Sequence, residues 1–291
     1  DFYSSRFLID KTIEFIDENL NDGKPFFAYV PFQAVHIPVQ APRENTEKYL
    51  GVYDEGWSKL RKDRHQKAVD LGLVSPRSGI KSMPWIRDWS ALSEETKKYE
   101  AKRMAVYAGM IDAMDFNIGR LITYLRETEQ LENTIFIFTS DNGAEGSGAS
   151  EPASFLSRSI AGNLGYNTDY ETLGQRGSYN SINPGFTSAA VSPLSFYKFY
   201  AGEGGMRVPL IISGKPLGEK IKLSTSFAWA TDVARTILSF ASIEPAGSRY
   251  RGKAVLAMTG KDLAPVIRGE SSRAYSKEEV IGYELTGHSA L

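Results

Sequence analysis

An acid–amide pair at the end of an apolar run is the part of this sequence best placed to do chemistry. Residues 134–138 are rich in β-branched and aromatic side chains, a composition typical of a strand buried on both faces. Asp141 and Asn142 follow shortly after this run. Ligand sites of open α/β sheets lie beyond the carboxyl ends of strands, and oxygen ligands of this kind suit Ca²⁺ or Mg²⁺. The pair therefore predicts a divalent metal site.

The next residue, Gly143, decides whether both side chains can reach one ion. Neighbouring residues of an extended chain point to opposite faces, so the chain must leave extended geometry at this point. A glycine permits that change. The alternative interpretation is that Asp141-Asn142-Gly143 is only a turn after a strand, and on the tripeptide alone the turn is the simpler interpretation.

Two basic residues, His36 and Lys198, could complete an anion site beside the metal pair. His36 follows an expected strand at residues 26–32, and Lys198 precedes a Gly-rich turn at residues 202–205. A metal cation, an imidazole and an ammonium around one point would bind a sulfate or phosphate ester and stabilise charge in its transition state. Each residue also has a structural interpretation, as a loop histidine between prolines and as one of many surface lysines.

Composition limits the classes of function. The 291 residues suffice for one large α/β domain or two small ones. A net charge of −1 provides no field that would attract nucleic acid or an anionic membrane, and no apolar run reaches the roughly 18 residues of a membrane span. The absence of cysteine excludes disulfides, thiolate metal sites and cysteine nucleophiles. Because the chain opens on Asp1 without a Met, we expect a piece of a longer protein.

Hydrophobic spacing predicts the elements that must position these residues. A long helix capped by Ser93 carries an apolar stripe from Met104 to Leu125, which should face the sheet. Residues 51–92 are polar and are expected to form solvated surface. Residues 144–196, rich in Gly, Ser, Asn and Tyr, are expected to form a long loop insertion that could be a wall of the pocket. Shorter segments are predicted as strands at 26–32, 210–213 and 280–284, and as helices at 4–20, 43–50, 227–240 and 262–266.

The order of five motifs resembles that of sulfatases. Asp-Asn-Gly alone is a weak signal, but the ordered set is specific and covers nearly all 291 residues. The long insertion, with residues 175–179 and Pro193, is similar to that of bacterial arylsulfatases in particular. The five motifs are residues 35–38 with Pro42, residues 107–119 with Asp115, residues 140–143, Lys198 five residues before residues 203–209, and residues 231–238.

The resemblance implies an alkaline-phosphatase-like α/β fold, with a mixed sheet flanked by helices, and hydrolysis of sulfate esters. By matching position, Asp141 and Asn142 would bind Ca²⁺, with Mg²⁺ as the alternative. His36 and Lys198 would contact the sulfate group of a small-molecule ester, and His36 would also assist the leaving oxygen. A periplasmic or secreted protein is favoured by the resemblance. The residues do not determine the oligomeric state, and we expect a monomer.

This chain departs from the sulfatase pattern at the nucleophile. Sulfatases use a formylglycine made from Cys or Ser within a Cys/Ser-x-Pro-Ser/Ala-Arg motif near the N-terminus. This chain has no Cys, and residues 150–153 begin the pattern but Ser154 stands where Arg is required. The family's first metal acids and an upstream Lys and His are missing too. Residues 1–291 are therefore interpreted as a partial sulfatase catalytic domain, incomplete in its sheet and with its nucleophile in a missing N-terminal segment.

Two other functions remain open. The metal pair and the basic residues do not distinguish sulfur from phosphorus, so a phosphate or phosphonate ester hydrolase of the same fold is one alternative. A non-catalytic anion-binding domain is the other. Ca²⁺ takes about six to eight oxygen ligands, and positioning without a nucleophile gives only weak assistance. We therefore expect residues 1–291 alone to bind Ca²⁺ poorly and not to turn over aryl sulfates.

Overall fold

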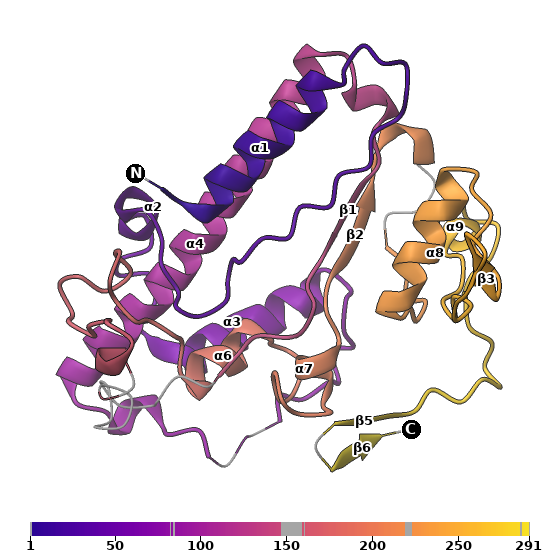
Figure 1. The fold of residues 1–291 in the computed structure, drawn as a ribbon. Coiled ribbons are helices and arrows are strands. Elements are labelled where there is room, and N and C mark those ends of the chain that lie inside the picture. Colours follow the sequence, from indigo (N-terminus) through magenta and orange to yellow (C-terminus); the bar gives the residue numbers. More distant parts are fainter. Residues whose placement is uncertain are drawn as a thin grey trace. The chain divides into compact units, whose positions relative to one another are not determined.

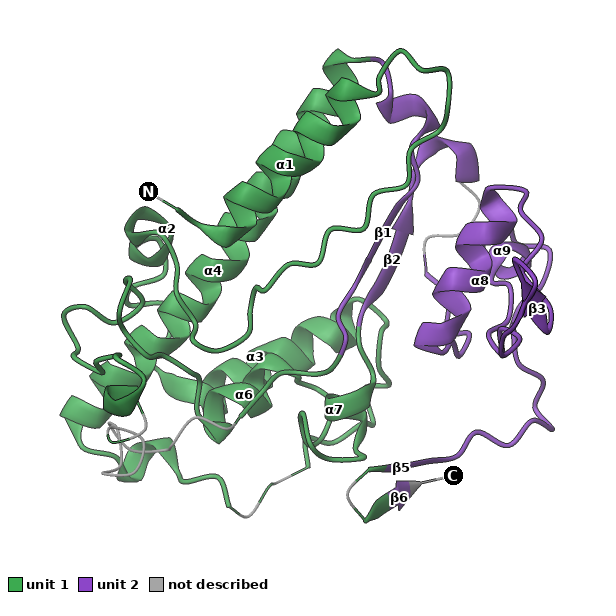
Figure 2. Ribbon diagram, viewed as in Figure 1, with its two compact units in different colours: residues 1–128, 142–208, 285–288 green, residues 129–141, 209–284, 289–291 purple. Residues whose placement is uncertain are grey.

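Two compact units make up the chain (Figure 2). The computed structural model describes residues 2–81, 83, 85–146, 159, 161–218, 223–285 and 287–290. The first unit contains residues 1–128, 142–208 and 285–288, and the second contains residues 129–141, 209–284 and 289–291. The chain therefore passes from one unit to the other between Asp141 and Asn142, in the middle of the predicted metal motif.

The first unit is mainly helical, and α4 (Glu94–Glu127) is its longest element (Figure 1). Ser93 caps this helix as predicted, because its hydroxyl accepts a hydrogen bond from Thr96 N at 3.2 Å. Two acidic residues lie in the first turn, near the positive end of the helix dipole. The other helices of the unit are α1 (Ser4–Glu18), α2 (Arg43–Glu47), α3 (Gly56–Asp70), α6 (Pro184–Ala190) and α7 (Glu203–Met206), with a 3-10 turn η1 (Trp89–Ala91).

An aromatic core joins α3, α6 and the first half of α4. Phe186 is 0% exposed, and its ring meets the edges of Trp57 and Trp89 at centroid distances of 5.4 and 5.7 Å. Tyr53 packs on the same ring at 6.0 Å. The sequence predicted solvated surface for residues 51–92, so α3 was missed. Its composition is mostly polar, and its largest buried apolar side chain is the indole of Trp57.

The buried stripe predicted on α4 is only partly present. Met104 and Leu125 are buried at its two ends, but Ile111 in the middle is 40% exposed. Within the first unit α4 packs against α1 and α2, and the face that is covered changes along its 34 residues. A single periodic stripe cannot match partners that lie at different angles around the helix.

Two other predictions for the first unit need correction. Residues 26–32 form no strand, because a strand needs a hydrogen-bonded neighbour and the described residues offer none at this segment. The predicted loop insertion at residues 144–196 contains the helix α6, which begins with Pro184 in its first turn and is largely buried. Residues 147–158 and 160 of that insertion lie outside the described residues.

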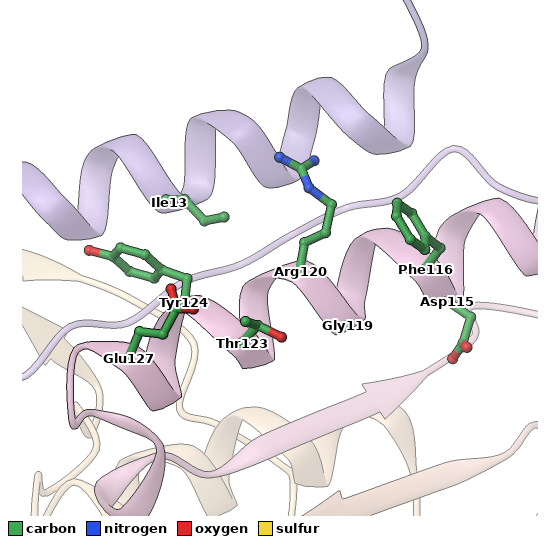
Figure 3. A pocket seen from close by; sticks show the side chains of 8 residues that line it. All are labelled: Ile13, Asp115, Phe116, Gly119, Arg120, Thr123, Tyr124 and Glu127. Carbon is green, nitrogen blue, oxygen red and sulfur yellow. The ribbon is translucent and has the colours of Figure 1, made fainter.

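An open hollow of about 550 Å³ lies between α1 and α4 (Figure 3). Arg120 reaches from α4 toward α1 and pairs with Asp10 at 2.7 Å, while Tyr124 donates to Asp17 at 3.0 Å. Asp115, part of the sulfatase-like motif at residues 107–119, lies at this hollow. None of the four predicted site residues lines it, so the hollow is separate from the predicted chemistry.

The second unit contains an antiparallel strand pair, β1 (Phe136–Thr139) and β2 (Leu210–Ser213). Their register pairs Phe136 with Ser213 and Thr139 with Leu210. Both strands were predicted, but β1 is not buried on both faces, since Phe136 and Ile137 are only half-buried and Phe138 and Thr139 are exposed. The remaining elements are η2 (Leu131–Asn133), η3 (Lys215–Leu217), α8 (Ala230–Phe240), α9 (Ala264–Ile267), and the short strands β3 (Arg249–Tyr250) and β4 (Lys253–Ala254).

The last two strands are β5 (Tyr283–Leu285) and β6 (His288–Ala290). The predicted strand at residues 280–284 overlaps β5, and the predicted helices at 227–240 and 262–266 overlap α8 and α9. Among the helices of the described residues, none is long and apolar enough to cross a membrane.

Truncating the ring at the centre of the core should be costly. We expect Phe186→Ala to lower the free energy of unfolding by about 3–5 kcal/mol, because a fully buried ring leaves a cavity among rigid aromatic neighbours. Phe15→Ala is the matched control, since that ring is 61% exposed on α1 and surface changes usually stay within about 0.5 kcal/mol. Urea unfolding followed by near-UV circular dichroism measures both. Equal losses for the two variants would contradict the packing described above.

Candidate functional site

Three ionisable side chains meet at one point of the first unit. Lys198 Nζ lies 2.9 Å from a carboxylate oxygen of Glu145 and 3.4 Å from Nε2 of His36. The same Glu145 oxygen is 3.5 Å from His36 Nε2. The Lys198 and Glu145 side chains are mostly buried, whereas the imidazole is more than half exposed. The structure therefore brings together His36 and Lys198, which are 162 residues apart in sequence.

Local hydrogen bonds fix the orientation of the imidazole. His36 N donates to Gln33 O at 2.8 Å, which holds the turn, and Nδ1 lies 2.9 Å from Ile37 O. A neutral ring that donates from Nδ1 to this carbonyl leaves Nε2 as an acceptor for the Lys198 ammonium. A protonated ring would instead donate from Nε2 toward Glu145. The site can therefore hold the imidazole in either protonation state.

Two backbone hydrogen bonds connect the segment after β1 to the segment around Lys198. Lys198 N donates to Ala144 O at 3.0 Å, and Gly143 N donates to Gly205 O at 2.8 Å. A Cβ at position 143 would lie 1.8 Å from Gly204 O, so only a glycine permits this approach. The Asp-Asn-Gly and Glu-Gly-Gly motifs are therefore complementary parts of one contact.

This contact gives a direct test. We expect Gly143→Ala to separate the two segments, because a methyl group cannot occupy a space that a carbonyl oxygen already fills. The variant should lose at least about 2 kcal/mol in the free energy of unfolding. Gly119→Ala is the control: position 119 lies in α4 with nothing within 4 Å of its Cβ, and alanine should stabilise that helix by about 0.5–1 kcal/mol. Thermal unfolding of both proteins measures the difference, and a neutral Gly143→Ala would contradict the close contact.

Helix α6 also holds Glu145, through a hydrogen bond to its backbone carbonyl. Thr187 Oγ1 donates to Glu145 O at 3.1 Å. Asn183 caps α6 by accepting a hydrogen bond from Phe186 N at 2.9 Å, which aligns the first turn of the helix. The residue that holds Glu145 is thus next in sequence to Phe186, the centre of the aromatic core.

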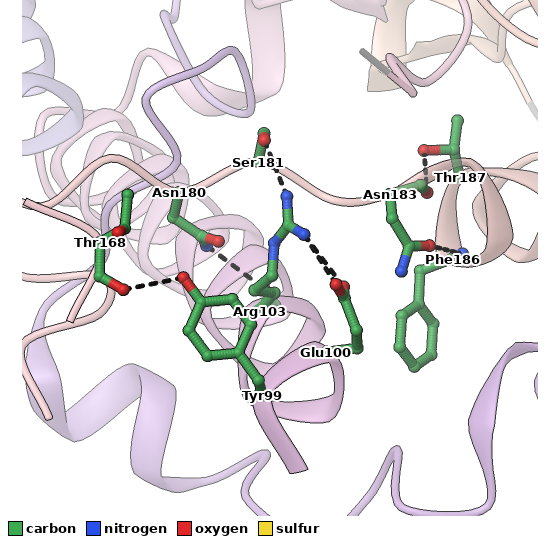
Figure 4. A network of polar contacts seen from close by, with 9 residues as sticks. All are labelled: Tyr99, Glu100, Arg103, Thr168, Asn180, Ser181, Asn183, Phe186 and Thr187. Carbon is green, nitrogen blue, oxygen red and sulfur yellow. Dashed lines mark hydrogen bonds and ion pairs between the residues drawn. The ribbon is translucent and has the colours of Figure 1, made fainter. Parts of the chain in front are cut away.

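A buried polar network holds the segment that leads into α6 against α4 (Figure 4). The guanidinium of Arg103 lies between Glu100, at 2.9 Å, and Ser181 Oγ, also at 2.9 Å. Asn180 is joined to the Arg103 carbonyl at 3.4 Å, and Tyr99 donates to Thr168 O at 2.9 Å. The insertion is therefore attached to the helix through charged and polar groups as well as through aromatic packing.

Burial sets the electrostatics of this network. Glu100 is 0% exposed, and desolvation raises the pKa of its carboxyl, although Arg103 and Asn183 act in the opposite direction. A raised pKa in the folded state means that the folded protein binds a proton more readily than the unfolded chain. This group therefore contributes stability at low pH, and that contribution is lost as pH rises from the unfolded value through the raised folded value.

Removing the buried cation should reveal this dependence. We expect Arg103→Met to lower the free energy of unfolding by about 3–5 kcal/mol at pH 7, because Glu100 remains buried without its cationic partner. The loss should be smaller at pH 5 than at pH 7, because removal of Arg103 raises the pKa of Glu100 further and makes the neutral carboxyl easier to form. Lys11→Met removes an exposed pair of the same spacing, Lys11 with Glu14, and should change stability by less than about 1 kcal/mol at either pH. Denaturant unfolding at the two pH values tests this, and a loss independent of pH would contradict it.

The two predicted metal residues belong to different units of the structure. Asn142 belongs to the first unit, three residues before Glu145, and is partly exposed. Asp141 is exposed and belongs to the second unit. Their oxygen donors fit a hard divalent cation. Within the described part of the chain no group of three or more His, Cys, Asp or Glu side chains could hold a metal ion.

Sequence reasoning missed Glu145. It lies four residues after Asp141 at the start of the expected insertion, and its carboxylate contacts both basic site residues. Its place just beyond a strand end was the available signal. That signal does not distinguish Glu145 from the other acids of the chain, because its contact with Lys198 arises from the backbone hydrogen bond between Lys198 N and Ala144 O.

Comparison with known proteins identifies the family. The sulfatase family model matches residues 1–243. The chain belongs to the sulfatase family. This sulfatase chain is 36% identical, over all of its length, to an uncharacterized sulfatase of Schizosaccharomyces pombe, and 31% identical, over 91% of its length, to an arylsulfatase of Klebsiella aerogenes. It covers 52% and 56% of these two proteins, so the chain spans about half the length of the curated relatives it matches.

Solved structures show the same fold. The crystal structure of Ps i-CgsB in complex with k-i-k-neocarrahexaose aligns with 91% of this sulfatase chain and 38% of the other chain, with a TM-score of 0.52 and 19% identity. The predicted fold class, an alkaline-phosphatase-like α/β fold that is incomplete in this chain, is thereby confirmed. The resemblance to sulfatases stated from the motifs is confirmed as well.

Proposed function

We propose that this chain is part of a sulfuric ester hydrolase of the arylsulfatase type, in which Lys198 and His36 contact the sulfate group of a small-molecule ester. The observation that carries this proposal is the 3.4 Å approach of Lys198 Nζ to His36 Nε2 beside the backbone contact of Gly143. Two basic groups at one partly exposed point offer an anion both a fixed charge and a proton donor. The family supports a sulfate ester as that anion.

The side chains divide the work by their chemistry. The Lys198 ammonium has three N–H donors, so it can keep its bond to Glu145 and still donate to a sulfate oxygen. Its charge offsets negative charge that builds up on the sulfuryl oxygens. His36, when protonated, can donate a proton from Nε2 to the leaving oxygen of the ester. Glu145 positions both groups and touches neither the sulfate nor the leaving oxygen in this scheme.

Two components of the proposed reaction lie partly or wholly beyond these residues. Asp141 and Asn142 would bind Ca²⁺, with Mg²⁺ as the alternative, and the ion would polarise the sulfuryl oxygens. Because Ca²⁺ takes about six to eight oxygen ligands, other parts of the protein would supply the rest. A formylglycine nucleophile would also come from outside residues 1–291, since this chain has no Cys and no complete modification motif.

Substitution of the two basic residues in the full-length protein tests the proposal. Lys198→Ala and His36→Ala should each lower kcat/KM for 4-nitrophenyl sulfate by about 10²–10³-fold, the effect of losing one transition-state donor or one general acid. Lys59→Ala, which removes an exposed lysine paired with Asp63, is the control and should leave kcat/KM unchanged. Residues 1–291 alone should show no turnover in the same assay.

Parallel measurements with other esters and with chelator distinguish the alternatives. A kcat/KM that is larger for a phenyl phosphonate or 4-nitrophenyl phosphate would replace the sulfatase proposal by a phosphorus ester hydrolase of the same fold. Activity unaffected by Lys198→Ala would leave the site only as an anion-binding region. Loss of activity in chelator and its return with Ca²⁺, in the native protein but not in Asp141→Ala, is the result expected for the metal pair.

A further inference from the structure

The segment that carries Lys198 is fixed by an aromatic cluster that the proposed chemistry does not use. Trp85 stacks on Tyr200 with centroids 5.6 Å apart and an interplanar angle of 14°, and its indole N–H donates to Tyr197 OH at 2.8 Å. Phe196 packs against both stacked rings, at 5.9 Å from Trp85 and 5.4 Å from Tyr200. Tyr197, the residue before Lys198, is buried and is held by this cluster.

The backbone of this segment is equally constrained. Phe196 and Phe199 have φ values of 67° and 77°, in the left-handed region that bulky residues rarely adopt. Glycines follow closely: a Cβ at Gly202 would lie 2.4 Å from the Phe196 ring, and one at Gly205 would lie 2.5 Å from Tyr197 O. The packing of the neighbouring residues therefore holds the Phe199 backbone in a conformation that phenylalanine rarely adopts, and this sets the direction of its side chain.

The Phe199 ring differs from the rest of the cluster in its surroundings. It is 53% exposed, and it makes no ring–ring contact with any residue that the structure describes. Its centroid lies 5.4 Å from Lys198 Nζ. An exposed apolar ring needs no explanation by itself, but this ring is the side chain next to the ammonium that the proposed function assigns to the sulfate group.

We propose that Phe199 binds the organic group of the ester and gives the site a preference for aryl sulfates over alkyl sulfates. This inference rests on the proposed function, because it takes Lys198 as the sulfate-binding group. Lys198 Nζ lies 5.4 Å from the Phe199 ring centroid. An ester whose sulfate is bound at Nζ can therefore turn its organic group toward this ring, where an aryl group would pair with it. An aryl ring gains both burial and ring pairing at Phe199, whereas an alkyl group gains burial alone.

The experiment compares two non-hydrolysable anions on the full-length protein by calorimetry. The probes are 1-naphthalenesulfonate, which has an aromatic face, and methanesulfonate, which has none. The variants are Phe199→Ala, Phe199→Tyr and the control Tyr250→Ala. Tyr250 is 55% exposed and lies 5.4 Å from the Arg251 guanidinium, so it repeats the exposure and the cation–ring distance of Phe199 in the second unit. Hydrolysis of 4-nitrophenyl sulfate and of ethyl sulfate is measured on the same proteins.

Phe199→Ala should weaken 1-naphthalenesulfonate binding about 5–10-fold and leave methanesulfonate within about 2-fold, while Phe199→Tyr and Tyr250→Ala retain the native affinities. Equal effects on the two probes would overturn the inference. A melting temperature lowered by many degrees in Phe199→Ala would also overturn it, since it would show that another segment covers the ring. An aryl preference in binding without release of sulfate from either ester would support the inference and count against the proposed function alone.

Discussion

The site depends on one close contact of backbone with backbone, at which Gly143 meets Gly204 and Gly205. The hydrogen bond from Gly143 N to Gly205 O and the one from Lys198 N to Ala144 O hold two segments that are distant in sequence at a spacing no side chain would allow. Backbone groups have fixed partners and little freedom, so they position the Lys198 side chain more narrowly than a contact between flexible side chains would. The ammonium, the carboxylate and the imidazole follow from that contact.

Residues of the insertion at 144–196 also stabilise this backbone contact. Thr187 bonds the carbonyl of Glu145, α6 carries Thr187, and the aromatic core and the Arg103 network hold α6 against α4. A buried ion pair such as Glu100 with Arg103 is a weak source of stability, because desolvation offsets most of its attraction. The hydrogen bonds of Arg103 to Glu100 and Ser181, however, form only when these residues lie at particular distances and angles. We regard the pair as a device that fixes the path of residues 180–183, a hypothesis that the Arg103→Met variant also addresses through the structure of the insertion.

The sequence predicts the elements that local residue patterns determine, and it fails where contacts between distant residues determine the structure. The Ser93 cap and the strands follow from local patterns: the strand predicted at 134–138 overlaps β1 at 136–139, and the one predicted at 210–213 coincides with β2. Helix α3 was missed because it is polar on nearly every face and one tryptophan anchors it. Residues 26–32 look like a strand, but pairing requires a neighbour that local composition cannot supply. His36 and Lys198 were proposed from residue type and motif order. Glu145 was missed, because a position beyond a strand end does not distinguish it from other acids, and its contact with Lys198 forms only in the folded chain.

The Glu145 carboxylate would repel an anion bound at Lys198. The position of Glu145 suggests a compensating advantage, the ordering of the Lys198 side chain. Glu145 is held through its own carbonyl by Thr187, so its side chain starts from a fixed point and reaches Lys198 at 2.9 Å. An ammonium on a four-carbon chain is otherwise mobile, and ordering it when the ester binds would reduce affinity. Glu145 orders it in advance. The cost is one negative charge near the point where the proposed reaction places the sulfate, and the Lys198 ammonium, 2.9 Å away, offsets that charge.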